Sequence, residues 1–339
     1  MTSIFSNVIK LLKNPRSTGP EEFIVIDIGL QRLTAAVFKP SAVGPTIVPK
    51  LMGLSRKTGL DEENVFALTS DALKTVESIV MHLPKKVLLG VSGLGSKTAT
   101  VVARVQRADS TKPITEYELQ EILEKSAQSQ TLFSVEEQKD YKLFFSSVVW
   151  ANIDGAKINN PVGSRGSSME VSCFHAYKKT NELDNWDRQL QDMGLEIKKI
   201  IPAAFALSKI IIRNGIQSLI LIRISEEKTE VSFITDTNIA EIATFDLGYE
   251  NLDLWTQAIS ILFTEVNLPK GLPDVIWVYP EGKEEVGERV RTNLLEINWT
   301  RDFKREIPNV KLGQKPEGFS VEDTPLISLG MEGISSGLA

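Results

Sequence analysis

Near the start of the sequence, an acidic residue and a glycine lie at the end of a short apolar run. Phe23–Ile28 has the length and composition of a strand, with Asp27 near its end and Gly29 just beyond it. A second β-rich run, Leu33–Phe38, follows at once, which predicts a hairpin with its turn near Gly29–Arg32. Glycine there lets the backbone approach a ligand, and the aspartate can hold a cation or water beside a phosphate. Spacing alone fits an ordinary first hairpin equally well.

A glycine-rich stretch at Gly90–Thr98 invites comparison with a P-loop, but its spacing is wrong. A P-loop places lysine directly after its second glycine, whereas Ser96 intervenes before Lys97 here. The residues that follow are β-branched and alternating, and so predict a strand. The two histidines, His82 and His175, are far apart in the sequence with no other histidine or cysteine beside either, which argues against a zinc site.

The composition predicts a globular protein with a large core and two or more subdomains. The chain has 339 residues, 42% hydrophobic and 24% charged, with a net charge of −6. Because nucleic-acid binding needs a basic face, the acidic balance argues against a general nucleic-acid partner. A single cysteine excludes an internal disulfide, and no stretch has the pattern of a membrane span or signal peptide. We therefore expect a cytoplasmic protein.

The first sixteen residues carry apolar side chains at helical spacing with basic residues among them. Pro15 stops the pattern, and Ser17–Pro20 has the composition of a linker. We expect a short basic amphipathic helix that lies on a membrane surface or docks on a partner; a helix packed on the protein's own surface, or a frayed tail, is the alternative. The candidate contact residues are Ile4, Phe5, Val8, Ile9, Lys10, Leu12 and Lys13.

The middle of the chain predicts a separate α+β segment. Ala99–Val105 and Tyr141–Trp150 have strand patterns, and between them Thr115 and Glu118 form a capping box at the start of a helix. Two turn sequences, Asn152–Gly155 and Asn160–Gly163, precede a further strand at residues 168–177.

This order of elements resembles the actin-like ATPase superfamily, and most of all its branch containing the cell-division protein FtsA and its relative PilM. The first hairpin, with Asp27-Ile28-Gly29, looks like the family's first phosphate motif, and the Asp154-Gly155 and Asn160–Gly163 turns resemble the inserted subdomain of FtsA. The resemblance covers roughly residues 22–334. It implies a two-domain fold and, for intact members, binding of ATP and Mg²⁺.

The second phosphate motif of the family departs from its pattern in this sequence. Arg223 stands at the aspartate position, Ser225, Glu226 and Glu227 at the glycine positions, and Lys228 at the first threonine position. The family's glycines let backbone N–H groups touch phosphate oxygens. A glutamate about 4 Å from a phosphate charge would instead cost roughly 4 kcal/mol at an effective dielectric of 20. We expect an exposed polar turn here.

The adenine motif is reduced as well, because the turn after the strand at residues 274–279 keeps only Gly282 of the family's glycines, and Pro280 removes an N–H donor. A single helix, Leu252–Val266, stands where the family has a fourth subdomain. We therefore expect nucleotide binding to be lost or very weak, and catalysis to be absent. The residual cleft positions are Asp27, Gly29, Gln31, Lys228 and Gly282.

The expected fold is α/β: an actin-like (ribonuclease H-like) two-domain fold with an inserted 1C/SHS2-type α+β subdomain and a truncated second half. The boundaries are 1–20 for the N-terminal segment and linker, 21–97 and 181–216 for subdomain 1A, 98–180 for the insert, 217–323 for the second half (2A with reduced 2B), and 324–339 for a closing helix of 1A.

By this resemblance, we expect a bacterial, FtsA-like division scaffold, a pseudo-ATPase at the inner face of the cell membrane. It would associate with itself and bind a tubulin-like partner such as FtsZ. A first alternative is a PilM-like adaptor of a pilus or secretion machine, which binds a peptide of a membrane protein. A second alternative is an active ATPase with a rebuilt site, in which Asp27 holds Mg²⁺ through water and Arg32, Lys97 and Lys228 contact phosphates.

Overall fold

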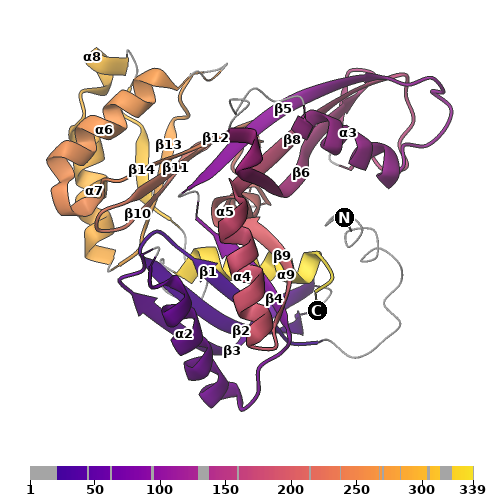
Figure 1. Cartoon of the computed structure of the whole chain (residues 1–339). Coiled ribbons are helices and arrows are strands. Elements are labelled where there is room, and N and C mark those ends of the chain that lie inside the picture. The colour runs from indigo at the N-terminus through magenta and orange to yellow at the C-terminus, as the bar shows by residue number, and fades with distance from the viewer. Residues whose placement is uncertain are drawn as a thin grey trace.

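The computed structural model describes residues 21–338 except for gaps at 44–45, 62, 93–94, 129–136, 159, 214, 237, 267, 269–270, 283, 304–305 and 314–322. The predicted N-terminal helix, residues 1–16, therefore lies outside the described residues. The described chain forms three β-sheets, each with its own helices (Figure 1). Among the helices of this part, none is long and apolar enough to cross a lipid bilayer.

The first sheet has the strand order β3-β2-β1-β4-β9. The predicted first hairpin is confirmed, since β1 and β2 pair antiparallel from Phe23↔Phe38 to Ile28↔Leu33, and β4 lies parallel on the other side of β1. The strands are β1 (Phe23–Ile28), β2 (Arg32–Val43), β3 (Thr46–Thr58), β4 (Lys86–Val91) and β9 (Glu196–Pro202), and the helices are α2 (Val65–Val80), α4 (Thr180–Asp192), α5 (Ala203–Arg213) and α9 (Thr324–Ser335).

Strand β1 is apolar except for Asp27, because both of its faces are covered by helices. Ile24 and Ile26 belong to a core that includes side chains of α2 and α4. Phe23 and Val25 belong to a different core, which includes side chains of α5 and α9. Since successive side chains of a strand point to opposite faces, Asp27 follows Phe23 and Val25 onto the α5/α9 face.

The second sheet, of order β5-β8-β6-β7, forms the predicted α+β segment. The predicted helix start is confirmed: the Glu118 backbone N–H donates to Thr115 Oγ1 at 3.2 Å. Its elements are β5 (Ser96–Gln106), α3 (Glu116–Gln128), η1 (Glu137–Lys139), β6 (Tyr141–Ile153), β7 (Ala156–Ile158) and β8 (Ser168–Lys179).

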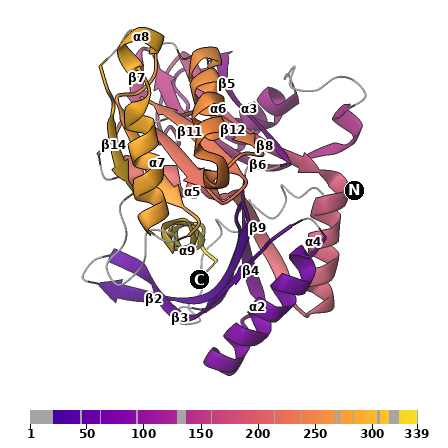
Figure 2. The ribbon, with the colours of Figure 1, turned by 90° about the vertical axis from the view of Figure 1, so that its left-hand side faces the viewer.

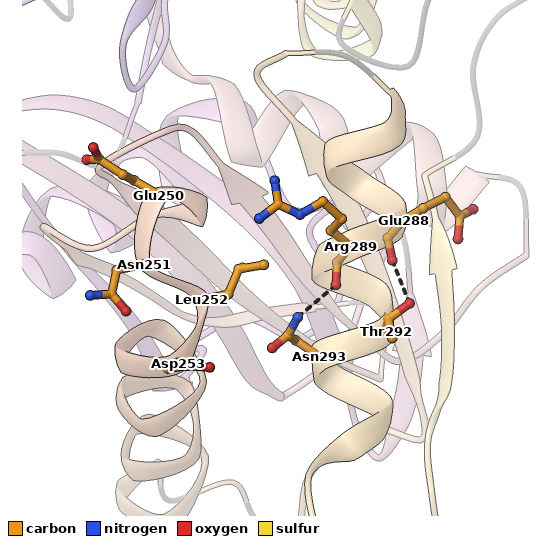
Figure 3. A pocket seen from close by; sticks show the side chains of 8 residues that line it. All are labelled: Glu250, Asn251, Leu252, Asp253, Glu288, Arg289, Thr292 and Asn293. Atoms are coloured by element: carbon orange, nitrogen blue, oxygen red, sulfur yellow. Dashed lines mark hydrogen bonds between the residues drawn. The ribbon is translucent and has the colours of Figure 1, made fainter.

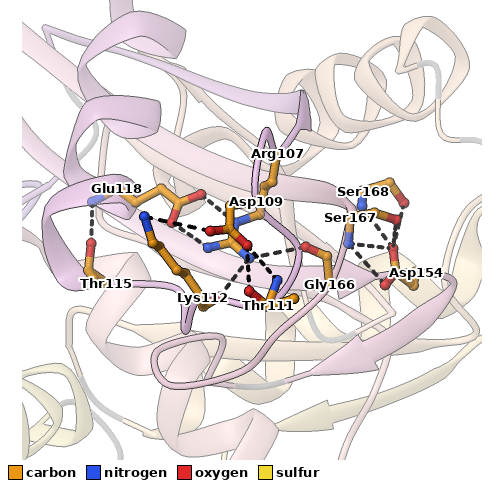
Figure 4. A network of polar contacts seen from close by, with 10 residues as sticks. All are labelled: Arg107, Asp109, Thr111, Lys112, Thr115, Glu118, Asp154, Gly166, Ser167 and Ser168. Carbon is orange, nitrogen blue, oxygen red and sulfur yellow. Dashed lines mark hydrogen bonds and ion pairs between the residues drawn. The ribbon is translucent and has the colours of Figure 1, made fainter.

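A buried arginine ties helix α3 to this sheet (Figure 4). The Arg107 guanidinium donates to both carboxylate oxygens of Glu118, at 2.7 and 3.1 Å, and to the carbonyls of Lys112 and Gly166, each at 3.0 Å. Bidentate arginine–carboxylate pairs combine charge with fixed geometry. The contact therefore sets the position of the first turn of α3 against the end of β5.

The third sheet has the order β12-β11-β10-β13-β14, and helices α6 and α7 lie side by side on it (Figure 2). The strand predicted at residues 274–279 is confirmed as β13, whereas neither edge strand was predicted. Its elements are β10 (Leu219–Ile224), β11 (Thr229–Thr235), β12 (Asn238–Phe245), η2 (Tyr249–Asn251), α6 (Leu252–Glu265), β13 (Val275–Pro280), α7 (Glu284–Glu296), α8 (Trp299–Phe303) and β14 (Asn309–Leu312).

One hydrophobic core connects all three sheets through helix α5. It contains Phe23 of the first sheet, Phe174 of the second and Leu221 of the third, packed with Phe205 of α5. Phe174 and Phe205 stack with their ring centroids 5.3 Å apart. The three sheets therefore meet at a shared apolar core. The end of β1 and the end of β10 face each other beside this core.

Candidate functional site

The first and third sheets repeat one local design at their centres. In each, a hairpin (β1–β2 or β10–β11) lies beside a parallel strand (β4 or β13). Leu219 and Leu221 of β10 belong to the core that joins the sheets, as do Trp277 and Tyr279 of β13. Strand alternation then places Arg223 on that face of β10. This is the face onto which Asp27 also points from β1.

Arg223 is the centre of a buried charge cluster between the two hairpins. Its side chain is 2% exposed, and its Nη2 lies 3.0 Å from Glu281 Oε1 and 3.8 Å from Asp27 Oδ2. Its Nη1 lies 3.3 Å from Glu230 Oε1, in the residue directly opposite it on β11. One guanidinium thus contacts carboxylates from three separate segments of the chain.

Glu281, just after β13, reaches across to the turn of the first hairpin. The Leu30 backbone N–H donates to both of its carboxylate oxygens, at 2.9 and 3.0 Å, and the Gln31 N–H donates to Oε2 at 3.0 Å. A Cβ added to Gly29 would lie 2.5 Å from Glu281 Oε1 and 2.7 Å from the Arg32 carbonyl oxygen. Glycine is therefore required at position 29 mainly because the Arg32 carbonyl is a backbone atom, and the Glu281 carboxylate adds to the crowding.

A second contact joins the turns of the two hairpins directly. The Gln31 side-chain amide donates to Glu227 Oε2 at 2.8 Å, and the Glu227 backbone N–H donates back to Gln31 Oε1 at 2.9 Å. The turn that contains Glu227 is closed by the Ser225 backbone N–H, which donates to the Lys228 carbonyl at 2.8 Å. The hairpin turns thus bond each other in the place where the family resemblance implies phosphate contacts.

The electrostatics of the cluster raise the pKa of Asp27. Burial raises the pKa of its carboxyl to about 6, against the opposing effects of Arg223 and Arg32, and the charges of Glu281 and Glu230 raise it further. Asp27 Oδ1 is buried and accepts no hydrogen bond from the residues that the structure describes. The pKa of Arg223 is raised by the three carboxylates despite its burial. The guanidinium occupies the space beside Asp27 as a permanent cation.

The five predicted cleft positions divide into two groups in the structure. Asp27, Gly29 and Gln31 lie at the cluster and its flanking turn. Lys228 closes its own tight turn through backbone groups. Gly282 lies against Tyr249, whose hydroxyl would be 3.3 Å from an added Cβ.

Two expectations need correction. The segment around the second phosphate motif is not simply an exposed polar turn, since Arg223 and Glu230 at its base are each 1% exposed; only the tip is open. Lys97, a candidate phosphate ligand of the ATPase alternative, pairs with Glu137 at 2.7 Å in the second sheet's own subdomain. Strand alternation was the signal that could have placed Arg223 in the interior.

Elsewhere, the described surface has a shallow hollow between the start of α6 and the middle of α7 (Figure 3). Polar and charged side chains dominate its lining, and none of the predicted cleft residues takes part. The residues are Glu250, Asn251, Leu252, Asp253, Glu288, Arg289, Thr292 and Asn293.

His175, the second histidine considered for chemistry, lies in the interior of the second sheet. Ser126 Oγ lies 2.9 Å from its Nε2 and Ser146 Oγ lies 2.8 Å from its Nδ1. Burial lowers the pKa of the imidazole to about 4, so the ring is neutral at physiological pH. Within the described residues, no group of three histidine, cysteine or acidic side chains is arranged to hold a metal ion.

Several solved structures are similar to this chain. The PilM–PilN type IV pilus biogenesis complex aligns with a TM-score of 0.61 at 13% identity, covering 93% of this chain and 99% of that one. An actin-like ATPase-fold protein of unknown function from Bacteroides thetaiotaomicron has a TM-score of 0.48 at 7% identity, covering 91% and 96%. The ethanolamine utilization protein EutJ from Carboxydothermus hydrogenoformans has a TM-score of 0.44 at 10% identity, covering 95% and 94%.

The sequence itself matches no protein-family model and no curated protein. At 13% identity, the likeness to the PilM–PilN structure establishes the fold and leaves the function to be argued from the site. The chain has an actin-like ATPase fold.

Proposed function

We propose that the protein is a non-hydrolysing, actin-like scaffold that binds protein partners instead of nucleotide. The observation that carries this proposal is the position of Glu281: its carboxylate accepts the backbone N–H groups of Leu30 and Gln31. In an actin-like ATPase these groups belong to the first phosphate motif. A phosphate at this place would meet a carboxylate about 4 Å away, a repulsion of roughly 4 kcal/mol at an effective dielectric of 20.

Magnesium is disfavoured at the same place. A Mg²⁺ ion held through water by Asp27 would have to approach the Arg223 guanidinium, whose Nη2 is 3.8 Å from Asp27 Oδ2. The two positive charges would repel each other in a buried site. The contacts of Asp27 and of the first hairpin turn therefore argue against the active-ATPase alternative.

Among the scaffolds, we favour the PilM-like adaptor over the FtsA-like division scaffold. The support is the match to the PilM–PilN complex, which extends over 93% of this chain and 99% of that one. By this analogy the protein binds a peptide of a membrane protein at the inner face of the cytoplasmic membrane. The basic amphipathic residues 1–16 would add contacts with the membrane or the partner.

Calorimetry with ATP and Mg²⁺ tests the absence of nucleotide binding. We expect no heat of binding up to millimolar ATP for the wild type, for Asp27→Ala, or for Asp71→Ala, a matched change at an exposed position on α2. Micromolar binding that Asp27→Ala abolishes and Asp71→Ala preserves would refute the proposal and return the protein to the nucleotide-switched members of its superfamily.

Sedimentation velocity separates the adaptor from the division scaffold. An adaptor of the PilM kind remains small as its concentration rises, whereas a division scaffold assembles with itself into larger species. A sedimentation coefficient that stays constant over a hundredfold range of concentration supports the adaptor. Growth into filaments would favour the FtsA-like role and a partner such as FtsZ. Flotation with anionic vesicles, before and after deletion of residues 1–16, tests the membrane contact separately.

A further inference from the structure

The turn between β1 and β2 and the Arg223 guanidinium together form a complete site for an oxyanion. The Leu30 and Gln31 backbone N–H groups point at one carboxylate, that of Glu281, and Arg223 Nη2 donates to the same group at 3.0 Å. Successive backbone N–H groups in a turn and a guanidinium are donors that proteins use for phosphate and carboxylate. Here the bound anion is part of the chain itself.

We propose that Glu281 is an intramolecular ligand that holds the two halves of the molecule closed, and that its removal exposes a site for inorganic phosphate. The inference rests on the proposed function, because it requires that no nucleotide phosphate competes for these donors. It adds to that function a fixed arrangement of the first and third sheets, maintained by one side chain instead of a diffusible nucleotide.

The strength of this closure follows from the burial of its parts. The Glu281 carboxylate is 6% exposed and the Arg223 side chain 2%, so neither is well screened by water, and charge-assisted hydrogen bonds of this kind contribute more than neutral ones. The Gln31–Glu227 pair adds a second contact at the outer edge. Because Leu30 and Glu281 are 251 residues apart in sequence, the bonds from the first hairpin to Glu281 join one sheet to the other.

Removal of Glu281 should leave the rest of the cluster able to fold. Arg223 retains two carboxylate partners, Asp27 at 3.8 Å and Glu230 at 3.3 Å. The chain also offers a matched control, since Glu285 carries the same charge four positions later on the exposed side of α7. Glu281→Ala and Glu285→Ala therefore change the net charge equally and differ only in the anion site.

Amide hydrogen exchange over residues 29–32, with and without inorganic phosphate, tests the proposal. In Glu281→Ala we expect the exchange of Leu30 and Gln31 to accelerate at least tenfold, and millimolar phosphate to restore the protection. The wild type and Glu285→Ala should show slow exchange and no response to phosphate. If Glu281→Ala does not fold, Glu281→Leu keeps a side chain of similar size without an oxygen acceptor and should show the same acceleration.

Protection that stays at the wild-type level in a folded Glu281 variant, with no response to phosphate, would overturn the inference. This outcome is separate from a failure of the proposed function, which would appear as ATP binding by the wild type. If exchange of Leu30 and Gln31 accelerates in Glu281→Ala but phosphate does not restore their protection, the result would support closure by Glu281 and refute the phosphate site.

Discussion

Replacing Asp27 by asparagine should stabilise the protein at neutral pH, although it removes a charge that lies 3.8 Å from Arg223. The pKa of Asp27 is about 6 in the folded protein, above its ordinary value of 3.8, and burial is the largest cause. A carboxyl with a raised pKa binds its proton more tightly in the folded state. The favourable contribution of this proton to the free energy of unfolding is therefore complete below pH 3.8, and it is lost as the pH rises through 6.

The magnitude follows from the same values. Each pKa unit corresponds to about 1.4 kcal/mol, so the rise from 3.8 to about 6 destabilises the ionised folded protein by about 3 kcal/mol. Asparagine keeps the size of the side chain and stays neutral at every pH. With an unfolding entropy of about 2.1 cal/mol/K per residue, a chain of 339 residues should gain about 4 °C in Tm at pH 7.

Thermal unfolding of the wild type and Asp27→Asn from pH 5 to pH 8 measures this effect. The difference in Tm should reach about half of its full value at pH 5, because pH 5 lies midway between the two pKa values, and should level off near pH 7. Asp71→Asn, an exposed replacement on α2, should stay within about 0.5 kcal/mol of the wild type at each pH. If Asp27→Asn is less stable than the wild type at pH 7, the attraction between Asp27 and Arg223 outweighs the cost of burying the ionised carboxylate. The cluster would then not raise the pKa of Asp27.

Three further experiments test other parts of the structure. Arg223→Met leaves buried carboxylates without their cation and should cost about 3–5 kcal/mol in urea unfolding, whereas the exposed Arg291→Met should cost less than about 1 kcal/mol. The NMR shifts of His175 should not titrate between pH 8 and pH 5, because its pKa is about 4; a midpoint near 6.5 would contradict its buried environment. Gly90→Ala places a Cβ 2.1 Å from Leu329 Cδ1 and should lower the free energy of unfolding by about 1–3 kcal/mol; an unchanged midpoint would mean that α9 can move away from β4.

Local patterns were sufficient to predict the first hairpin and the start of α3. The apolar run at Phe23–Ile28 and the capping box of Thr115 and Glu118 each lie within a few residues of chain, and the structure confirms both. The edge strands β12 and β14 were missed because edge positions place weaker demands on sequence: one side of such a strand lacks a hydrogen-bonded neighbour in its sheet.

The candidate site was predicted only in part, since its decisive contact joins distant segments. The turn after β13 was interpreted as a degenerate adenine motif, and nothing local to Glu281 indicates that it will bond Leu30. A signal was nevertheless present in strand alternation. Asp27, Arg223 and Glu281 each continue the face of their strand that carries residues of the core between the sheets, so a comparison of the three strands would have placed these side chains together.

Under the proposed function, Glu281 meets the hydrogen-bonding requirement of the first hairpin turn from within the chain. Leu30 is 2% exposed, and a buried backbone N–H left without an acceptor costs about 1–3 kcal/mol. Replacement of the motif residues by small neutral side chains alone would leave the Leu30 and Gln31 donors unpaired when the two halves close. Glu281 supplies the acceptor from within the chain, and Arg223 compensates its charge at 3.0 Å. In the proposed function, the same carboxylate disfavours a nucleotide phosphate and lets the hairpin keep a turn shaped for an anion. We therefore expect the removal of Glu281, and not the absence of glycines from the second motif, to alter the closed state.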